Sequence, residues 1–355
     1  MTQNERTEKA LQLLKQLISI QSFSSEEDQT ADAIQDWLKS FDIPFERMQN
    51  NVFAKNKYWS NTKPTLLLNS HHDTVKPNQA YTKDPFHPHI EEGRLYGLGS
   101  NDAGGCLVSL LATFTHFYDR KDLSHNILMV ASMEEENAGK NSLRGLLPHL
   151  PEIDVAIVGE PTLMDLAIAE KGLIVFDAVV KGTPSHAAHP NDDNAIYNTI
   201  AVLEWFKQYR FDKTSEVLGD VKMTVTQIKA GSQHNVVPSQ VELVIDVRVN
   251  DAYSNQEIAD LLKSEAPCEL QERGLKLNSS RIDKDHPLVQ SGIALGRKTY
   301  GSPTLSDQAA LTCQSLKLGP GDSRRSHSAD EYIYVHEIEE GIDLYIQLLE
   351  GFLKK

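Results

Sequence analysis

Acidic and histidine side chains follow short apolar runs at several points in this sequence. The stretch Leu66–Val75 reads LLLNSHHDTV, so an apolar run ends in two histidines and an aspartate. Ile127–Ala131 leads into Glu134–Glu136, and Val155–Val158 leads into Gly159–Thr162, which reads GEPT. Apolar runs of this length, alternating with helical patterns, are typical of parallel strands. Because active sites assemble at the carboxyl ends of such strands, we expect these side chains to meet at one edge of a sheet.

Two further segments carry residues of the same kinds. An aspartate lies in the Gly-rich loop Gly97–Gly105, ahead of an apolar helix, and a histidine lies in Gly319–Glu331, which reads GPGDSRRSHSADE. Borderline cations such as Zn²⁺ bind well to His nitrogen and Asp or Glu oxygen. In two-metal sites the ions lie about 3.5–4 Å apart and a carboxylate commonly bridges them. The sequence supplies such a ligand set as His71, Asp102, Glu136, Glu160 and His327.

Glu135 is left over from this set, as a base that would take the proton of the attacking water. Each element also has a plainer interpretation. Consecutive glutamates often mark the solvated start of a helix, Glu160 before Pro161 could be a turn residue, and a His-x-Asp pair alone is weak support for a metal site. We expect His72 to be a neighbour of the ligand rather than a ligand. The metal hypothesis rests on five elements that occur together, at corresponding strand ends.

Length and composition are those of a soluble globular protein with room for two domains. The chain has 355 residues, and each of two domains could bury its own core. A net charge of -15 argues against nucleic acid or an anionic membrane as a partner. The first residues are charged and amphipathic rather than a signal peptide. Cys106, Cys268 and Cys313 are scattered and odd in number, which favours free thiols and a cytoplasmic location over a cysteine-based zinc site.

The pattern of elements changes along the chain. After a helix near Thr7–Ile20, Ser24 and Glu27 resemble a capping box for the next helix, and strands then alternate with helices to about Asp165. A βαββαβ series follows, typical of a small two-layer domain. Its expected elements are strand Leu173–Val180, helix Asn194–Tyr209, strands Val221–Lys229 and Val237–Asn250, helix Asn255–Ser264 and strand Cys268–Leu275. On the first of these helices the expected apolar face is Ile196, Ile200, Leu203 and Phe206.

We therefore predict an α/β domain with a largely parallel central sheet and an inserted two-layer α+β domain of ferredoxin-like plan. Residues 1–165 and 280–355 form the first, metal-binding catalytic domain. Residues 166–279 form the inserted domain. The α/β domain resumes near Ile282 and ends in the helix Glu337–Leu353.

These motifs together resemble the co-catalytic zinc metallopeptidase and deacylase family. That family includes acetylornithine deacetylase, succinyl-diaminopimelate desuccinylase, carboxypeptidase G and aminoacylase, and the resemblance spans essentially the whole chain. The matching motifs are His71-His72-Asp73, Asp102 in its Gly-rich loop, Glu134-Glu135-Glu136, Gly159–Thr162 and His327–Glu331.

The resemblance implies roles for these residues. His71 and Glu160 would hold one Zn²⁺ or Co²⁺ ion, Glu136 and His327 the other, and Asp102 would bridge the two. Asp73 would orient His71. Two positions depart from the family pattern. Gly104 stands where many relatives carry Lys. The triplet begins with Glu134 rather than Asp, and this leaves a one-residue ambiguity over which glutamate is the base.

The inserted domain carries matches of its own. Gly182–His186 resembles the loop whose histidine, here His186, stabilises the tetrahedral intermediate in the neighbouring subunit's site; the alternative is a surface-loop histidine. Asn235 matches the family's substrate-contacting asparagine. Alternation along Val241–Asn250 puts Arg248 on the polar face, where the family uses an arginine to hold a substrate α-carboxylate. Without the resemblance, Arg248 would be a solvated strand residue.

Within the family, the compact length and the GPGDSRRSH form of the last motif most resemble acetylornithine deacetylases and their acetylcitrulline-cleaving relatives. This resemblance implies removal of an acetyl group from N-acetylornithine or N-acetylcitrulline, in arginine biosynthesis, by a homodimer that pairs through the inserted domain. Arg324 or Arg325 near His327 would add positive potential at the substrate, which leaves open a succinyl group, or both could point to solvent. The alternatives are a desuccinylase of succinyl-diaminopimelate or succinyl-ornithine or -citrulline, a di- or tripeptidase, and a non-catalytic relative that binds small molecules.

Overall fold

The computed structural model describes residues 2–354, and these form two compact units. The first unit runs to Ile168 and resumes at Arg281–Tyr300 and again from Ser306. The second unit consists of Ala169–Ser280 and Gly301–Leu305. The expected limits after residue 165 and before residue 280 lie close to these, whereas the short return Gly301–Leu305 is not visible in the sequence pattern.

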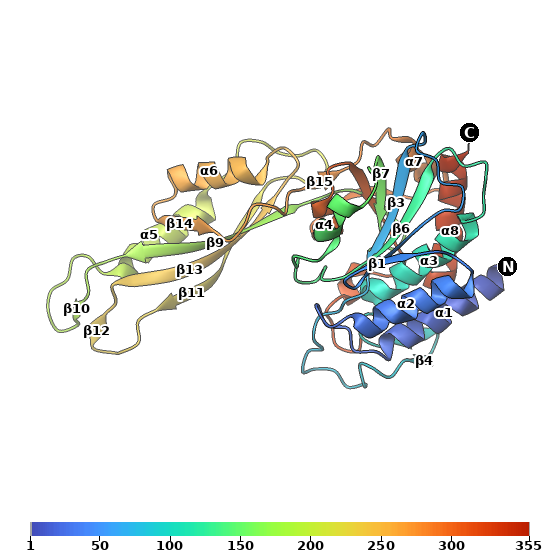
Figure 1. The fold of residues 1–355 in the computed structure, drawn as a ribbon. Coiled ribbons are helices and arrows are strands. Elements are labelled where there is room, and N and C mark those ends of the chain that lie inside the picture. The colour runs from blue at the N-terminus through green and yellow to red at the C-terminus, as the bar shows by residue number, and fades with distance from the viewer. Residues whose placement is uncertain (1, 355) are drawn as a thin grey trace. The chain divides into compact units, whose positions relative to one another are not determined.

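The central sheet of the first unit has parallel strands in its middle (Figure 1). The strand order is β1 (Glu46–Met48), β2 (Asn51–Lys55), β6 (Asn126–Ser132), β3 (Thr65–His71), β7 (Val155–Val158), β17 (Gln314–Lys317), β8 (Leu166–Glu170) and β15 (Ser280–Arg281), and β16 (Thr299–Ser302) pairs with β8. β3 runs parallel to β6 and to β7, and β7 runs parallel to β17. β1 and β2 close one edge in antiparallel pairs. The predicted α/β class is confirmed.

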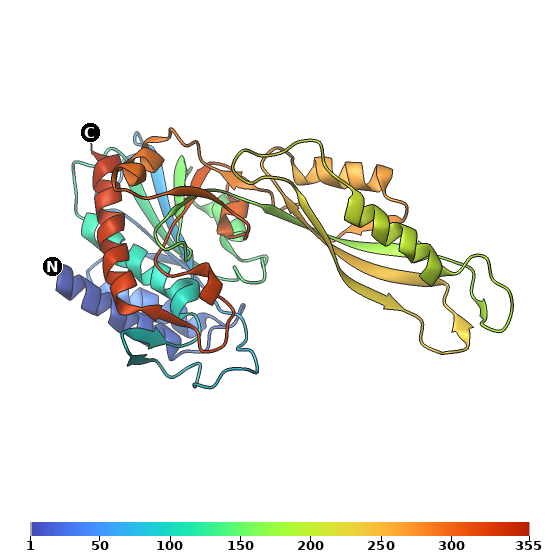
Figure 2. The same cartoon turned by 180° about the vertical axis from the view of Figure 1, so that it is seen from behind.

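Helices bury both faces of the central strands. One face carries α1 (Gln3–Ile18), α2 (Asp28–Ser40), α3 (Gly105–Phe117), α7 (Pro287–Ala294) and α8 (Val335–Leu353), and Figure 2 shows α8 beside α3. Leu66 and Leu68 of β3 join this core, while Leu67 joins a second cluster on the other face with the short helix α4 (Leu143–Leu146). Because both faces are covered, the central residues of β3, Leu66–Leu68, are apolar, and the polar residues Asn69–His71 follow where the strand ends.

A small three-stranded sheet, ordered β18 (Tyr332–Tyr334), β5 (Arg94–Tyr96) and β4 (His89–Glu91), lies beside the central one in the same unit. β18 begins directly after the acidic pair Asp330-Glu331, and its partner β5 precedes the Gly-rich loop Gly97–Gly105. The pairing therefore brings two of the sequence motifs together, although more than two hundred residues separate them in the chain.

The predicted capping box before α2 is wrong. α2 begins at Asp28 with Glu27 at its N-cap, and no side chain caps it. The Ser24 hydroxyl instead donates to the Asp73 carboxylate at 2.7 Å, and the Glu27 carboxylate accepts the backbone N–H groups of Ser25 and Glu134. Asp73 and Glu134, which are distant in the sequence, thus take the place of a helix cap because this segment lies beside the ends of β3 and β6.

The second unit has the predicted βαββαβ plan. Its antiparallel sheet is ordered β11 (Lys222–Ala230), β13 (Gln240–Val249), β9 (Gly172–Lys181) and β14 (Glu269–Glu272), with helices α5 (Ala195–Gln208) and α6 (Asn255–Glu265) and a separate short ladder of β10 (Ser185–His186) with β12 (Val236–Val237) (Figure 1). Both helices contribute to one core with the alternate β13 residues from Val241 to Val249. The predicted alternation along β13 is confirmed.

The apolar face predicted for α5 is partly wrong. The buried residues are Ala195, Thr199, Val202 and Phe206, whereas Ile196 and Ile200 are 44% and 57% exposed. The sheet therefore covers the side of α5 that carries these four residues, and Ile196 and Ile200 face outward. Tyr197, 69% exposed, lies next to them, so α5 presents an apolar surface made of Ile196, Tyr197 and Ile200. Among the helices formed by residues 2–354, none has the length and apolar composition that a bilayer crossing requires.

Candidate active site

The ends of three neighbouring strands deliver most of the predicted site. His71 is the last residue of β3 and pairs in register with Ser132, the last residue of β6, two residues before the glutamate triplet Glu134–Glu136. On the other side of β3, Asn69 pairs with Val158 of β7, two residues before Glu160. Because all three strands are parallel, their polar ends emerge together at one edge.

The His71 imidazole lies at the centre of a buried group of carboxylates. Its Nε2 atom is 3.2 Å from Asp102 Oδ1, 3.8 Å from Glu160 Oε1 and 4.0 Å from Glu135 Oε2. The His71 side chain is 1% exposed and each of the three carboxylate side chains is 12% exposed. Water therefore has little room to solvate these charges.

The second histidine approaches the same group from the other end of the chain. His327 Nε2 lies 3.1 Å from Glu136 Oε2 and 3.7 Å from Asp102 Oδ2. Asp102 thus presents one carboxylate oxygen to His71 and the other to His327. The structure brings the five predicted ligands into one cluster, in which His327 is the most exposed member, at 56% of its side chain.

This set of donors fits divalent cations. Ligand atoms of His71, Asp102 and Glu136 lie within 4.8 Å of one another, and so do those of His71, Glu135 and Glu160. Both groups offer imidazole nitrogen with carboxylate oxygen, the donors that Zn²⁺ and similar ions accept. These two groups differ from the ligand sets expected for the two ions. Both groups contain His71, one contains Glu135, and neither contains His327.

The electrostatics of the cluster point the same way. Burial raises the pKa of Glu160 to about 8, with a further contribution from the charge of Asp102. Burial likewise raises the pKa of Glu135 well above its usual value. The hydrogen bond with Glu136 raises the pKa of His327 to about 9, against the opposing effect of burial. Burial thus disfavours the ionised form of these carboxylates; when all four are ionised, they exceed the positive charge that the two imidazoles can supply, and bound cations would compensate the difference.

Asp73 organises the site without facing it. Its backbone carbonyl lies 2.9 Å from His71 Nδ1, and its carboxylate accepts the backbone N–H groups of Glu135 at 3.0 Å and Glu136 at 3.1 Å. The Asp73 side chain is fully buried. Burial alone would raise its pKa, but the hydrogen bonds from His71 and its other partners lower it, so the carboxylate is held in its charged form.

His72 points to the opposite side of the chain from His71. Its Nε2 atom is 2.9 Å from the backbone oxygen of Asn50, and its Nδ1 atom is 2.8 Å from Thr30 Oγ1. Burial lowers the pKa of His72 to about 4, so this imidazole is neutral near pH 7. The side chain serves the packing of α2, which agrees with its expected place beside the ligand rather than in the ligand set.

The glutamate triplet divides between two environments. The Glu134 carboxylate accepts hydrogen bonds from Ser25 Oγ at 2.8 Å and from the backbone and side-chain nitrogens of Asn141 at 2.9 and 3.0 Å. Glu135 and Glu136 instead approach the two histidines. The geometry therefore leaves Glu135 and Glu136 as the functional pair and gives Glu134 a structural position.

Sequence reasoning missed the part that Glu331 takes in the site. This side chain is 2% exposed, and its carboxylate accepts the backbone N–H groups of Gly99 at 3.2 Å and of Asn101 and Asp102 at 2.9 Å each. Burial raises its pKa to about 8. Glu331 thus fixes the loop that carries Asp102. The available signal was an acidic pair directly after His327, but spacing alone does not say what an acid binds.

The arginine pair near His327 has partners of its own. Arg325 makes a bidentate ion pair with Glu337 at 2.6 and 3.0 Å, and its guanidinium carbon lies 4.9 Å from the centre of the Tyr332 ring. Arg324 pairs with Asp322 at 2.6 Å. The guanidinium of Arg325 is therefore part of the packing around β18 and α8, and the geometry does not support its expected contact with substrate.

In the second unit, two of the predicted substrate residues lie together. β10 pairs with β12, so that His186 is opposite Val236, and the Ala187 N–H donates to the Asn235 carbonyl at 3.0 Å. His186 and Asn235 are both exposed. Arg248 lies elsewhere on the polar face of β13, where Asp246 accepts two of its hydrogen bonds at 2.8 and 3.0 Å.

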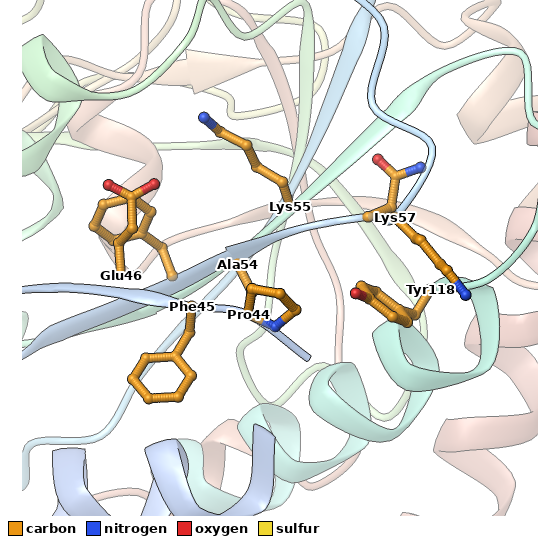
Figure 3. A pocket seen from close by; sticks show the side chains of 9 residues that line it. Pro44, Phe45, Glu46, Ala54, Lys55, Lys57 and Tyr118 are labelled. Atoms are coloured by element: carbon orange, nitrogen blue, oxygen red, sulfur yellow. The ribbon is translucent and has the colours of Figure 1, made fainter. Parts of the chain in front are cut away.

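A separate hollow of about 370 Å³ lies beside the edge strands β1 and β2 (Figure 3). It shares no lining residue with the carboxylate cluster. Lys57 on its rim pairs with Asp119 at 3.1 Å, and the Lys55 ammonium lies 5.3 Å from the centre of the Trp59 ring. The cations of this hollow are thus engaged by neighbours, and the acid–histidine cluster remains the site with the chemistry.

Comparison with known proteins places the chain in a family. Residues 67–351 match the model of peptidase family M20/M25/M40, and the chain belongs to this family. It is 25% identical to the succinyl-diaminopimelate desuccinylase of Rickettsia bellii, over 95% of each chain. It is 27% identical to the acetylornithine deacetylase of Proteus mirabilis, over 96% of each chain. It is also 27% identical to the LysW-lysine/LysW-ornithine hydrolase of Saccharolobus solfataricus, over 98% of this chain and 97% of that one.

Solved structures agree on the fold. A tripeptidase from Staphylococcus aureus superposes with a TM-score of 0.77 at 17% identity, covering 97% of this chain and 98% of its own. An M20 metallo-carboxypeptidase from Sulfolobus solfataricus superposes with a TM-score of 0.76 at 17% identity, covering 97% and 99%. The predicted family is confirmed at this level: the protein is a metal-dependent hydrolase with the M20 metallopeptidase fold.

The Gly104 departure has a steric explanation, which gives a prediction. A Cβ atom at this position would lie 2.5 Å from the Gly99 carbonyl oxygen and 2.7 Å from Leu14 Cδ1. We expect Gly104→Ala to lower the free energy of unfolding by about 1–3 kcal/mol, the usual range for overpacking. Urea denaturation measures the change.

Gly274→Ala is the matched control, because a Cβ there meets nothing within 4 Å. It should change the stability by less than about 0.5 kcal/mol. Equal stability of the two variants would contradict the steric explanation, because it would mean that the loop before α3 can accommodate a Cβ atom at position 104.

Proposed function

We propose that this hydrolase removes a short N-acyl group, most simply acetyl, from an amino acid, and that two divalent ions, Zn²⁺ or Co²⁺, serve as its cofactors. The observation that carries the proposal is the position of Asp102, whose two carboxylate oxygens face His71 and His327 separately. Such an arrangement suits a carboxylate bridge between two ions. Glu135 beside it supplies a base that a binding protein would not need.

Each residue takes a role that its contacts support. His71 and Glu160 would hold one ion, His327 and Glu136 would hold the other, and Asp102 would bridge them. When bound, the ions polarise the scissile carbonyl and lower the pKa of the attacking water. Glu135 accepts a proton from that water and later gives it to the leaving amine nitrogen. Asp73 keeps His71 and the Glu135–Glu136 backbone in place.

The acyl group is inferred from the paired arginines. A succinyl group carries a second carboxylate and would need a cation to receive it. Arg325 is bound by Glu337 and Arg324 by Asp322, which favours the smaller acetyl group. N-acetylornithine and N-acetylcitrulline are the preferred substrates. Arg248 would release Asp246 and bind the substrate α-carboxylate in its place. Relatives that are named desuccinylases keep a succinyl-amino acid as the second candidate.

We further propose that the protein is a homodimer that pairs through the second unit. The apolar surface of α5 is exposed, and Ile228 on the edge strand β11 is 60% exposed. α5 packs against β11, so these side chains belong to one part of the unit. Pairing of two copies would cover apolar surface that water now contacts. His186, exposed on β10, would then act on the partner subunit's substrate.

The first test of this proposal concerns the base. Glu135→Gln should lower kcat by about 10²–10⁴, because a general base contributes about that much, while the content of divalent metal stays near that of the parent. Glu136→Gln should reduce metal content as well as rate. Steady-state kinetics and elemental analysis of the same preparations give both numbers.

Glu134→Gln serves as the control, because that side chain is engaged by Ser25 and Asn141 outside the cluster. It should keep kcat within about tenfold of the parent. A large loss in Glu134→Gln with an active Glu135→Gln would shift the assignment of the base by one residue.

The substrate proposal is tested by comparing kcat/KM across a panel. N-acetylornithine and N-acetylcitrulline should exceed their succinyl analogues, succinyl-diaminopimelate and a set of dipeptides by more than about tenfold, or roughly 1.4 kcal/mol in transition-state binding. The reverse order for succinyl compounds would support the second candidate. A clear preference for dipeptides would replace both with a peptidase.

The dimer proposal is tested by sedimentation and by mixing subunits. Ile200→Asp should convert the dimer to a monomer, because burying an unpaired charge in a covered apolar surface costs several kcal/mol. Lys207→Asp, a charge change on the same helix, is the control. Mixing inactive Glu135→Ala with inactive His186→Ala subunits should then restore part of the activity. No recovery after proven subunit exchange would mean that His186 does not act across the interface.

A further inference from the structure

The three backbone N–H groups of the glutamate triplet all donate to buried carboxylates. Glu134 N–H donates to Glu27 Oε1 at 3.1 Å. Glu135 and Glu136 donate to the two carboxylate oxygens of Asp73, at 3.0 and 3.1 Å. The path of this loop, and with it the direction of the Glu135 side chain, is therefore set by two acids that lie outside the cluster. Asp73 belongs to a known motif, whereas Glu27 does not.

Glu27 is held in its own place by several donors. The side chain is 0% exposed. Besides the Glu134 N–H, its carboxylate accepts the Ser25 N–H at 2.7 Å and the side-chain nitrogen of Asn50 at 3.2 Å. A buried carboxylate is tolerated only when hydrogen bonds replace its hydration, and each donor here comes from a different part of the chain. Its position is thus fixed by its surroundings.

The residues next to Glu27 strengthen the same connection. Ser24 Oγ donates to Asp73 Oδ2 at 2.7 Å, and Ser25 Oγ donates to Glu134 Oε1 at 2.8 Å. The Thr74 N–H donates to the Ser22 carbonyl at 2.8 Å. Glu134 itself has a φ of 53°, in the left-handed region that non-glycine residues seldom adopt. A backbone in this conformation needs partners to hold it, and this segment supplies them.

We propose that Glu27 is a positioning residue for the reaction: by binding the Glu134 N–H it sets the loop that aims Glu135 at the substrate. The inference rests on the proposed function of Glu135 as the base. A displacement of about 1 Å in a catalytic group can cost on the order of 10²-fold in rate, so loss of this contact should lower turnover more than substrate binding. Glu27 would act without touching substrate.

Glu27→Asp is the test, because it keeps the charge but withdraws the carboxylate by one methylene. We expect kcat to fall by about tenfold or more, with KM within about threefold and metal content unchanged. Glu27→Gln retains an oxygen that can accept the Glu134 N–H, and should keep kcat within about threefold. Hydrogen exchange of the peptide spanning residues 132–138 reports on the loop directly: it should be faster in Glu27→Asp and unchanged in Glu27→Gln.

Asp154→Ala is the matched control. The Asp154 carboxylate accepts the Thr65 N–H at 2.7 Å at the opposite end of β3, so its loss should lower stability and leave kcat and the exchange of 132–138 unchanged. Unchanged exchange in Glu27→Asp overturns the proposal, as does faster exchange with parental kcat. If the parent enzyme hydrolyses no N-acyl amino acid, the proposed function fails, while the exchange experiment still decides whether Glu27 holds the loop.

Discussion

The cost of burying carboxylates at one edge of a parallel sheet is the constraint on which this structure depends. Three strands end beside one another, and each delivers an acid or a histidine into a space that is largely closed to water. An unpaired charge in such a place costs several kcal/mol or changes its protonation. The buried acids of this protein are stabilised in two different ways, and this difference distinguishes the structural acids from the functional ones.

The structural acids are satisfied by backbone N–H groups. Asp73 takes the amides of Glu135 and Glu136, Glu27 takes that of Glu134, and Glu331 takes three amides of the loop around Asp102. Each of these acids fixes one loop that carries a member of the site. The functional acids instead face one another and the two histidines. They are Asp102, Glu135, Glu136 and Glu160. Within residues 2–354 these four acids lack backbone donors of this kind, and bound cations would stabilise their charges.

The sequence predicted what local pattern determines. Apolar runs followed by polar residues predicted parallel strands and the approach of His71, the glutamate triplet and Glu160 at their ends, because a parallel sheet aligns strand ends whatever the loops do. Alternation in β13 gave its buried face for the same reason. Pattern does not determine which partner a polar side chain takes, so the spacing of Ser24 and Glu27 predicts a local cap that the structure does not contain. It also could not say which side of α5 the sheet covers, because that helix has apolar residues on two faces.

The central claim, that the acid–histidine cluster holds two divalent ions, is tested most directly by metal analysis. Protein purified without chelator and assayed by elemental analysis should contain about two divalent ions per chain. Asp102→Asn should lower the content of both ions, because one carboxylate serves both positions. Dialysis against a chelator should remove activity, and zinc or cobalt should restore it. Full activity in protein shown to be free of metal would contradict the account.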